Sequence, residues 1–322
     1  MTATDQRTTA ARGYRRASHA GVRLGLLTAI VSAIGVWGCW QVFVNSSAGQ
    51  RVDQAALTGA LYGRSHLWPV AQQVLDVVSV AFIAIVLLTV VLIAAMRRRW
   101  MLAIQVTVLL AGANATTQLL KVDVFPRPDL GQAPSYGNTL PSGHTTAAAS
   151  VSAALLFVVP PRMRPWVAIV GASYTAATGV STLIGQWHRP SDVLAALLVV
   201  LAWSGLASAL VATGIDAPLR GTPTGSVRRV AAGRRAESTP VVLLGAVAAL
   251  AGVPAVVALR RTWDSTGPVE SGTALVTAYA GGALGVVAAT FAAFALLLVV
   301  RRTAGRPTAP DNPQRTSSVL PA

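Results

Sequence analysis

The residues Pro141-Ser142-Gly143-His144 stand directly before an apolar stretch and could form an anion-binding turn. A glycine-containing turn at a helix N-terminus presents free backbone N–H groups and the positive end of the helix dipole, and both attract an anion. Ser142 adds a hydroxyl donor. Serine is also a common helix N-cap, which would leave His144 without a special role. The segment therefore favours either an anion cradle with a histidine beside it or an ordinary cap.

His188 and Asp192 are four residues apart at the start of another apolar stretch. At this spacing the carboxylate can accept a hydrogen bond from one ring nitrogen and leave the other free to act as a nucleophile. The alternative is an interfacial histidine followed by an acidic residue in the first turn of a helix. The sequence predicts the first arrangement, because two of the chain's 4 histidines fall in these two polar segments.

Two cations, Lys121 and Arg127, precede the first segment, and Lys121 is the only lysine in the chain. Lys121 either contributes to the site or extends to the membrane surface along its apolar stem. Together with Ser142 and Gly143 the cations would hold an anion beside His188, and His144 could protonate a leaving oxygen. The histidines and scattered carboxylates lack the spacing of a zinc site. Phosphoryl transfer with no metal and no cofactor is the predicted chemistry.

The composition predicts that these residues are carried by membrane helices. Of the 322 residues, 53% are hydrophobic and 11% are charged, whereas soluble domains average about 25% charged residues. The net charge is +15, but the arginines form short groups between apolar runs, which is typical of membrane topology signals and not of a nucleic-acid-binding face. The single cysteine, Cys39, cannot form an internal disulfide. We expect an all-α, polytopic membrane protein with no nucleic-acid partner.

A membrane-spanning helix needs about 20 mostly apolar residues. On this criterion the sequence predicts eight spans, at 24–44, 72–96, 101–120, 144–161, 166–187, 191–213, 241–259 and 273–300. With the N-terminus in the cytoplasm, alternation of these spans puts most of the 26 basic residues inside. Both termini are then predicted to be cytoplasmic, and both polar segments lie on the opposite, extracytoplasmic face.

The predicted organisation has five parts: a basic cytoplasmic N-terminus (1–23), a six-helix membrane core (24–213), a cytoplasmic linker (214–240), a two-helix hairpin (241–300) and a disordered cytoplasmic tail (301–322). Gly281 and Gly285 have the Gly-x-x-x-Gly spacing that allows close helix packing. We expect the hairpin to pack against the core or against a second copy of the chain, which leaves a homo-oligomer open.

These motifs resemble those of the type 2 phosphatidic acid phosphatase superfamily of membrane lipid phosphatases. The family has a lysine followed by six residues and Arg-Pro, then Pro-Ser-Gly-His, then Ser-Arg, five residues, His, three residues and Asp. The resemblance covers roughly residues 70–213, and its specific residues lie within 121–192. It implies a six-helix phosphatase core, with the C-terminal hairpin outside it.

The resemblance also implies a role for each residue. His188 would attack phosphorus and form a phosphohistidine that water hydrolyses, with Asp192 orienting it and His144 acting as general acid. The phosphate oxygens would be held by Lys121, Arg127, Ser142 and Gly143.

The chain departs from the family pattern at two places. Five residues, not six, separate Lys121 from Arg127, and Thr182 stands where the family has an arginine after the serine, here Ser181. Loss of that charged donor weakens transition-state stabilisation. Arg189, next to His188, is the candidate replacement, and Ser181 retains a hydroxyl that can bind phosphate.

The predicted function is therefore metal-independent hydrolysis of a lipid phosphate or diphosphate at the outer face of the plasma membrane. Isoprenyl diphosphate, phosphatidate and phosphatidylglycerophosphate all remain open as substrates. The preference for arginine over lysine, with abundant alanine, indicates a bacterial source with GC-rich DNA. The alternative is a catalytically degenerate member that binds or moves lipid phosphates or scaffolds partner proteins.

Overall fold

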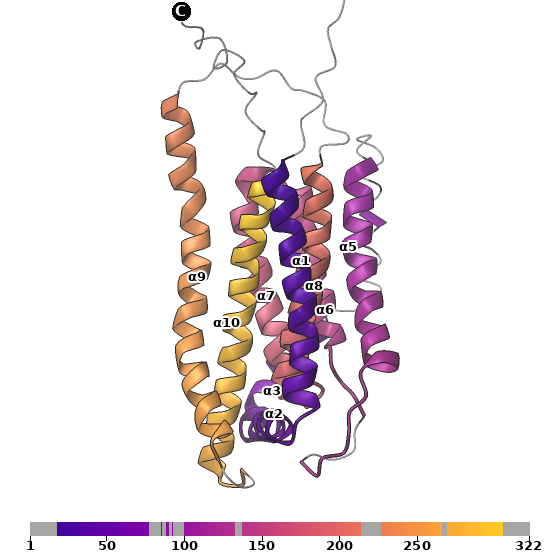
Figure 1. Ribbon diagram of the computed structural model, residues 1–322. Helices are drawn as coiled ribbons and strands as arrows, with labels where there is room; N and C mark the ends of the chain where they lie inside the picture. The colour runs from indigo at the N-terminus through magenta and orange to yellow at the C-terminus, as the bar shows by residue number, and fades with distance from the viewer. Residues whose placement is uncertain are drawn as a thin grey trace, which may run out of the picture.

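The computed structural model describes residues 18–76, 85, 88–89, 92, 100–132, 137–213, 227–265 and 269–304. Over these residues the chain forms helices and no strand (Figure 1). Six helical segments are long and apolar enough to cross a membrane. The prediction of an all-α, polytopic membrane protein is confirmed.

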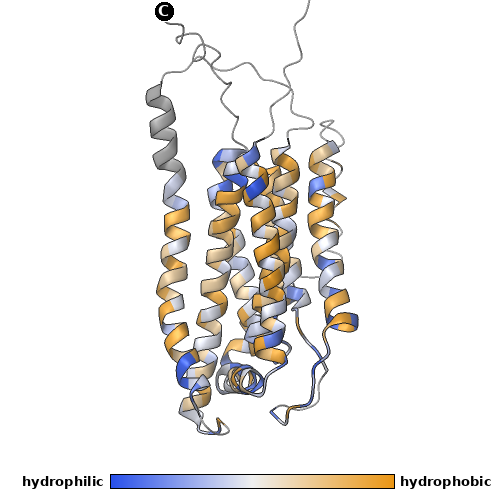
Figure 2. Cartoon of the chain, in the orientation of Figure 1, coloured by the Kyte–Doolittle hydropathy of each residue, from blue (hydrophilic) through white to orange (hydrophobic). Residues whose placement is uncertain are grey.

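Most of the long helices run side by side along one axis (Figure 1). Their bounds are α1 (His19–Cys39), α5 (Trp100–Leu119), α6 (Gly143–Val158), α7 (Arg164–Ile184), α8 (Pro190–Ala212), α9 (Val227–Trp263) and α10 (Gly272–Ala304). Figure 2 shows that apolar residues dominate their length and that polar residues gather toward the two ends of the bundle. Each lies on one of the predicted spans, whereas the predicted span at 72–96 falls mostly outside the described residues.

The helix α6 is apolar but shorter than the other candidate spans. It ends at Val158 because Pro160 and Pro161 follow. Proline has no backbone N–H, and it disfavours helical geometry in the residue before it.

Two helices begin between the first two predicted spans, where the sequence predicted none, and the second of them runs into the predicted span at 72–96. They are α2 (Ser47–Gly59) and α3 (Leu61–Asp76). The Ser46 hydroxyl caps α2 by accepting a hydrogen bond from the Gly49 N–H at 3.0 Å. In Figure 1, α2 is seen end-on, so it lies across the end of the bundle. Its apolar side chains Val52, Ala55 and Ala56 are buried there.

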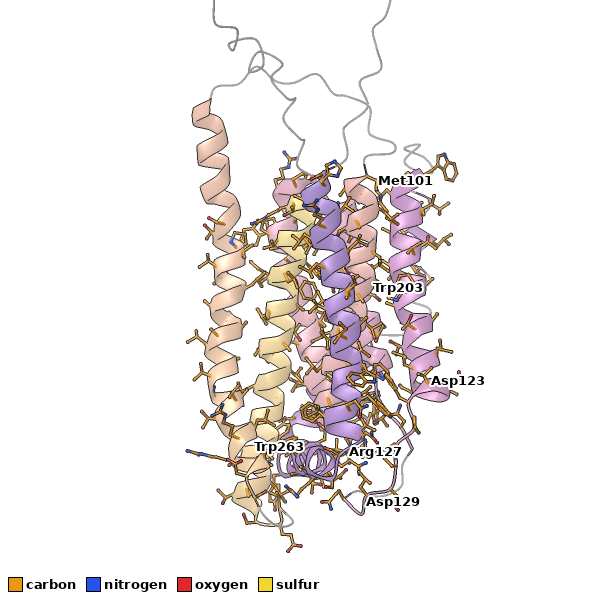
Figure 3. The ribbon with its side chains drawn as sticks, in the orientation of Figure 1. Met101, Asp123, Arg127, Asp129, Trp203 and Trp263 are labelled. Carbon is orange, nitrogen blue, oxygen red and sulfur yellow. The ribbon has the colours of Figure 1, made fainter. Side chains whose placement is uncertain are left out.

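The last helix, α10, lies inside the bundle, in contact with α1, α2, α7 and α8, and α9 packs along it. The largest core cluster draws Leu109 from α5, Leu156 from α6, Leu183 from α7 and Phe294 from α10. The C-terminal pair thus packs against the other helices of its own chain, through α10. Figure 3 marks the two ends of the bundle, with Met101 near one and Arg127 and Asp129 near the other.

Candidate active site

The first polar segment ends at the N-terminus of α6. Ser142 is the N-cap, and its hydroxyl accepts a hydrogen bond from the Thr145 N–H at 3.3 Å. Ser142 is fully buried, and Gly143 and His144 form the first turn. Ser142 therefore acts as the cap of α6. The backbone N–H groups of the first turn face the end of the bundle where the second polar segment, which contains His188 and Asp192, also lies.

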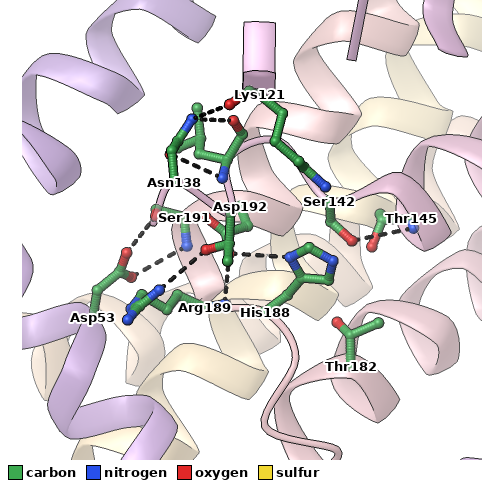
Figure 4. A network of polar contacts seen from close by, with 12 residues as sticks. Asp53, Lys121, Asn138, Ser142, Thr145, Thr182, His188, Arg189, Ser191 and Asp192 are labelled. Atoms are coloured by element: carbon green, nitrogen blue, oxygen red, sulfur yellow. Dashed lines mark hydrogen bonds and ion pairs between the residues drawn. The ribbon is translucent and has the colours of Figure 1, made fainter. Parts of the chain in front are cut away.

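The second polar segment ends at the N-terminus of α8. Arg189 is the N-cap, Pro190 occupies the first helical position, and the Arg189 N–H donates to Asp192 Oδ2 at 2.9 Å. The same oxygen lies 3.2 Å from His188 Nδ1 (Figure 4). Proline suits this first helical position because it lacks the backbone N–H that would have no partner there, and because its fixed φ is already helical. Within the described residues, His188 Nε2 makes no hydrogen bond, so that nitrogen is free for chemistry.

The two helix N-termini are joined directly. The Ser142 N–H donates to the backbone carbonyl of Asp192 at 2.9 Å. The ring centroids of His144 and His188 are 6.5 Å apart, and His144 is tilted against Trp187 at 5.2 Å. The structure therefore brings both histidines and Asp192 into one site, although the histidines are 44 positions apart in the sequence.

Lys121 also reaches this site. It lies in the single π-helical turn that follows α5, Leu120–Val124. Figure 4 shows its side chain extending toward Ser142 and His188, and its charge acts on both His144 and Asp192. Asn138 Nδ2 donates to the Lys121 carbonyl at 3.4 Å and fixes the backbone there. The shortened spacing between Lys121 and Arg127 therefore does not remove the lysine from the site.

Arg127 brings a guanidinium with unused donors to the same place. Its Nη1 and Nη2 atoms are buried and have no hydrogen-bond partner within the described residues. Burial, followed by repulsion from Arg189, lowers the pKa of Arg127, and the carboxylates Asp53 and Asp192 act in the opposite direction. A buried cation without a partner is costly. The arrangement is that of a site prepared to receive an anion.

Arg189, the candidate replacement for the missing arginine, is already held by neutral groups. Its Nη1 donates to Thr139 Oγ1 and its Nη2 to Gln54 Oε1, both at 3.1 Å. The residue is 2% exposed, and its Nε has no partner within the described residues. Arg189 therefore adds positive charge close to Arg127, while its terminal nitrogens link the start of α8 to Thr139 and to Gln54 of α2.

Thr182 does not take over the role of the missing arginine. Its hydroxyl donates to the Gly179 carbonyl within α7 at 2.7 Å. Its own carbonyl accepts the N–H groups of Trp187, at 3.0 Å, and His188, at 3.3 Å. Ser181 is buried beside it, and its hydroxyl takes no part in the hydrogen bonds described above. The backbone of Thr182 thus supports the turn that carries His188, and its side chain faces its own helix.

Two residues that the sequence analysis missed, Asp53 and Gln54, come from α2. Asp53 is 2% exposed. Its Oδ1 accepts the Ser191 N–H at 3.2 Å, and its Oδ2 accepts the Ser191 hydroxyl. Burial, and secondarily the charge of Asp192, raises the pKa of Asp53 to about 7. Polar neighbours surround Asp53 in the sequence (Gln50, Arg51 and Gln54), so no local signal marked it as buried, whereas Asp76, the acidic residue of α3, is exposed.

A cavity of about 310 Å³ lies on the far side of Asp53 and Ser191. Its walls come from α2, α8, α9 and α10 and are mostly apolar; they include Leu194, Val256 and Val286. Neither His188 nor His144 lines it. The C-terminal helix pair thus forms part of the structure directly behind the candidate site.

Residues 102–215 match the family model of the PAP2 superfamily. The matched segment contains all nine residues that the sequence analysis proposed for the site, from Lys121 to Asp192, and excludes Asp53, Gln54, α9 and α10. Comparisons with curated proteins and with solved structures found no match. The resemblance to the type 2 phosphatidic acid phosphatase superfamily is thus confirmed over this segment of the chain.

Proposed function

We propose that this chain, which carries the PAP2 superfamily match over residues 102–215, hydrolyses a lipid phosphate or diphosphate without a metal, through a phosphohistidine on His188. The substrate class is an isoprenyl diphosphate, a phosphatidate or a phosphatidylglycerophosphate. The superfamily supports a phosphate ester as substrate. The embedding of the site in a bundle of membrane helices supports a lipid.

One observation carries the proposal: the Arg127 guanidinium is buried with both terminal nitrogens unpaired, beside an oriented His188–Asp192 pair. A phosphate group would supply oxygen acceptors for those nitrogens, and arginine binds phosphate oxygens with well-directed, charge-assisted hydrogen bonds. A site that only needed structural stability would pair the arginine with a carboxylate. An arginine left without a partner in the free protein is typical of a side chain that pairs with a bound ligand.

In the first step, His188 Nε2 attacks the terminal phosphorus, the P–N bond forms, and the bond from that phosphorus to the leaving oxygen breaks; this oxygen belongs to the lipid alcohol in a monophosphate and to the lipid monophosphate in a diphosphate. His144 donates a proton to the departing oxygen. Asp192 Oδ2 holds the Nδ1 proton of His188 and stabilises the positive charge on the ring. In the second step, His144 takes a proton from water, water oxygen attacks phosphorus, and the P–N bond breaks. Inorganic phosphate leaves, and His188 is regenerated.

The remaining residues would hold the phosphate oxygens. Lys121 and Arg127 supply positive charge, and Ser142 and the Gly143 N–H act at the N-terminus of α6, where the helix dipole adds to their effect. Arg189 Nε and the Ser181 hydroxyl are the further donors that we assign to phosphate. The family has an arginine at the position of Thr182, so this chain has one positive charge fewer there. The charge of Arg189 offsets part of that loss.

We place the reaction at the outer leaflet of a bacterial plasma membrane, with both termini in the cytoplasm. The support is the distribution of arginines, which favours this orientation. In the structure, α1 begins and α10 ends at the end of the bundle opposite the site (Figure 1).

A second candidate function is binding of lipid phosphates without turnover. The observation that favours it is Thr182, whose hydroxyl is satisfied by Gly179, together with the engagement of both terminal nitrogens of Arg189. Such a protein would keep the anion-binding residues and lack sufficient stabilisation of the transition state.

The test is phosphate release by the purified protein in detergent with EDTA present. The panel is phosphatidate, phosphatidylglycerophosphate and an isoprenyl diphosphate. His188→Ala should lower release at least 1000-fold, since activity without the nucleophile is typically reduced by factors of about 10³ or more. His66→Ala, an exposed histidine of α3, is the matched control and should retain full activity.

Two results would count against catalysis at His188. Release that persists in His188→Ala removes the proposed nucleophile. Absence of release from every substrate, with saturable binding of the same lipids that Arg127→Gln abolishes, identifies the non-catalytic function instead.

A further inference from the structure

The apolar cavity beside Asp53 and Ser191 is long and narrow. Its walls follow one face of α9, from Gly252 to Thr262, and one face of α10, from Ala278 to Ala289. At 1.5 Å of rise per residue, each of these stretches is about 15 Å long. The cavity volume of about 310 Å³ is spread over that length, so the space runs along the helices and has little width.

The polar side chains of the cavity wall are already hydrogen-bonded to the protein. Ser191 donates its N–H and its hydroxyl to Asp53, and the Thr262 hydroxyl donates to the Ala258 carbonyl at 2.9 Å. The other wall residues, such as Leu194 of α8, are apolar. A cavity with an apolar lining excludes water and binds apolar molecules.

Two glycines keep this space open. Among the described residues, a Cβ atom at Gly285 would meet only the Ala255 Cβ, at 3.9 Å, and one at Gly252 only the Ala288 Cβ, at 3.5 Å. Both are ordinary van der Waals distances, so neither glycine is required for the close approach of α9 and α10. Glycine is less favourable than alanine inside a helix by up to about 1 kcal/mol. The missing side chains therefore add to the cavity and not to helix contact.

The cavity lies in the half of the bundle that carries the candidate site. Ser191, in the first turn of α8, and Thr262, near the end of α9, line it at that end, and Ala289 is halfway along α10. A length of about 15 Å is half of the ~30 Å hydrocarbon thickness of a bilayer. The wall residues Val256 and Leu259 are 51% and 37% exposed. The cavity is therefore open along α9, where lipid of the adjacent leaflet surrounds the bundle.

We propose that this cavity binds one acyl chain of a membrane phospholipid from the leaflet next to the candidate site. The cavity has the length of one leaflet, an apolar wall and an opening toward lipid. Its small width suits an unbranched acyl chain better than a methyl-branched isoprenoid chain. This phospholipid is distinct from the substrate, because neither His188 nor His144 lines the cavity.

The bound chain would connect two parts of the molecule. It would touch α2 and α8 on one side and α9 and α10 on the other, and α8 belongs to the segment that matches the superfamily. Within a bilayer the chain gains van der Waals contacts with the wall and is not removed from water. The lipid is a structural ligand in which no bond is broken, so the inference does not depend on the proposed hydrolysis.

The test is photo-crosslinking of the full chain in phosphatidylcholine vesicles that contain a phosphatidylcholine with a diazirine in one acyl chain. Mass spectrometry of the digested protein then locates the labelled residues. We expect label on Ala278 and Val286, which line the cavity and are 6% and 3% exposed. Gly285→Leu should lower this label at least tenfold, because the leucine side chain fills the space that the lipid chain requires.

Gly245→Leu is the matched control. It adds the same side chain to α9 at an exposed position outside the cavity, where a Cβ atom meets nothing within 4 Å, and it should keep the label. Should Gly285→Leu fail to fold, Ala289→Leu fills the cavity from the same helix. Val253, which is 67% exposed and outside the cavity, should be labelled in every variant and shows that each is in the membrane.

Two results would overturn the proposal. In the first, label is confined to exposed residues such as Val253. In the second, Val286 is labelled equally in the wild type and in Gly285→Leu. A parallel experiment with an isoprenyl chain that carries the diazirine identifies the type of chain. Stronger labelling of Val286 by that probe than by the phosphatidylcholine would overturn the assignment of an acyl chain.

Discussion

At the scale of single residues, Asp192 combines two tasks in one carboxylate oxygen. Oδ2 accepts the Arg189 N–H at 2.9 Å and lies 3.2 Å from His188 Nδ1. The first interaction stabilises the start of α8, and the second orients the histidine. Because the backbone fixes the oxygen, the ring is oriented before any substrate arrives. Such preorganisation is what allows a histidine to act as a nucleophile without a metal.

Asp53 is expected to make the stability of the folded protein depend on pH. Its pKa is raised to about 7 by burial and, secondarily, by Asp192, whereas an aspartate in an unfolded chain titrates near 3.9. The folded state therefore holds the proton more tightly, and stability contributed by Asp53 is lost as pH rises through about 7. We expect the wild-type Tm to fall between pH 5 and pH 8 and the slope to be shallower in Asp53→Asn.

Thermal unfolding in detergent across that pH range checks this expectation. Asp76→Asn alters an exposed carboxylate in α3 and serves as the control, with the slope of the wild type. An Asp53→Asn slope equal to that of the wild type would contradict the assignment of the pH dependence to Asp53.

Short sequence motifs were enough to predict the candidate site residues within the PAP2 segment. Asp53 and Gln54 were missed because they reach the site through contacts between residues far apart in the sequence. His188 and Asp192 are only four positions apart, so their spacing was enough to suggest the pairing, although His188 precedes the first residue of α8. The contact between Asp53 and Ser191 spans 138 positions, and nothing in the sequence around Asp53 specifies its partner. Thr182 shows the same limit, because the support that its carbonyl gives to the His188 turn depends on backbone geometry and not on side-chain type.

At the scale of elements, long apolar runs were predicted and short helices were not. About 20 apolar residues are a strong local signal for a spanning helix. The helix α2 has 13 residues, a mixture of polar and apolar side chains, and no capability to cross a bilayer. It forms because Ser46 caps it and because its apolar face meets α10 and the π-helical turn that follows α1, Trp40–Val44. That burial depends on tertiary packing, which periodicity does not encode.

The position of α2 depends on Gly49. A Cβ atom at this residue would lie 1.8 Å from the Val42 carbonyl oxygen, far inside van der Waals contact. We expect Gly49→Ala to displace α2, to weaken the contacts of Asp53 and Gln54 with the α8 N-terminus, and to lower both Tm and phosphate release. The reduction in rate should exceed tenfold, because site geometry must be held within about 0.5 Å.

Gly38→Ala is the matched control for this substitution. A Cβ atom there meets nothing within 4 Å, and alanine is favoured over glycine inside a helix by up to about 1 kcal/mol. Its Tm should equal or slightly exceed that of the wild type. If both variants behave alike, α2 does not position the site.

At the scale of the whole molecule, the two ends of the bundle differ in what they carry. The candidate site, Arg127 and Asp129 lie at one end, and the start of α1 and the end of α10 lie at the other (Figure 3). The proposed orientation puts the first end outside the cell. We expect Asp129→Cys to react with a membrane-impermeant thiol reagent in intact cells and Arg162→Cys to react only after permeabilisation.

Both positions are exposed, and the native Cys39 is buried, so the wild type provides the background. Labelling in the reverse pattern would invert the topology and with it the leaflet that supplies the substrate.

The packing of α9 and α10 against the other helices was the feature of the whole molecule that the sequence predicted least. In lipid, helices associate through small residues that allow close approach, and such residues occur throughout this chain. Gly281 approaches Ala258 of α9, while its neighbour Gly282 approaches Pro190 of α8. Many pairings therefore satisfy the same sequence rule, and only three-dimensional packing selects the one in which α10 is internal.

The internal position of α10 sets an order for assembly during synthesis. Ribosomes deliver the chain from the N-terminus, so every residue of the candidate site enters the membrane before α10 has been translated. Until then, the surfaces of α7 and α8 that α10 covers face lipid, and α2 lacks its close contact between Gly59 and Leu275. The helix α10 thus completes a bundle whose candidate site lies entirely upstream, and a nonsense codon between positions 213 and 272 would yield a chain with every residue of the candidate site and an unfinished scaffold.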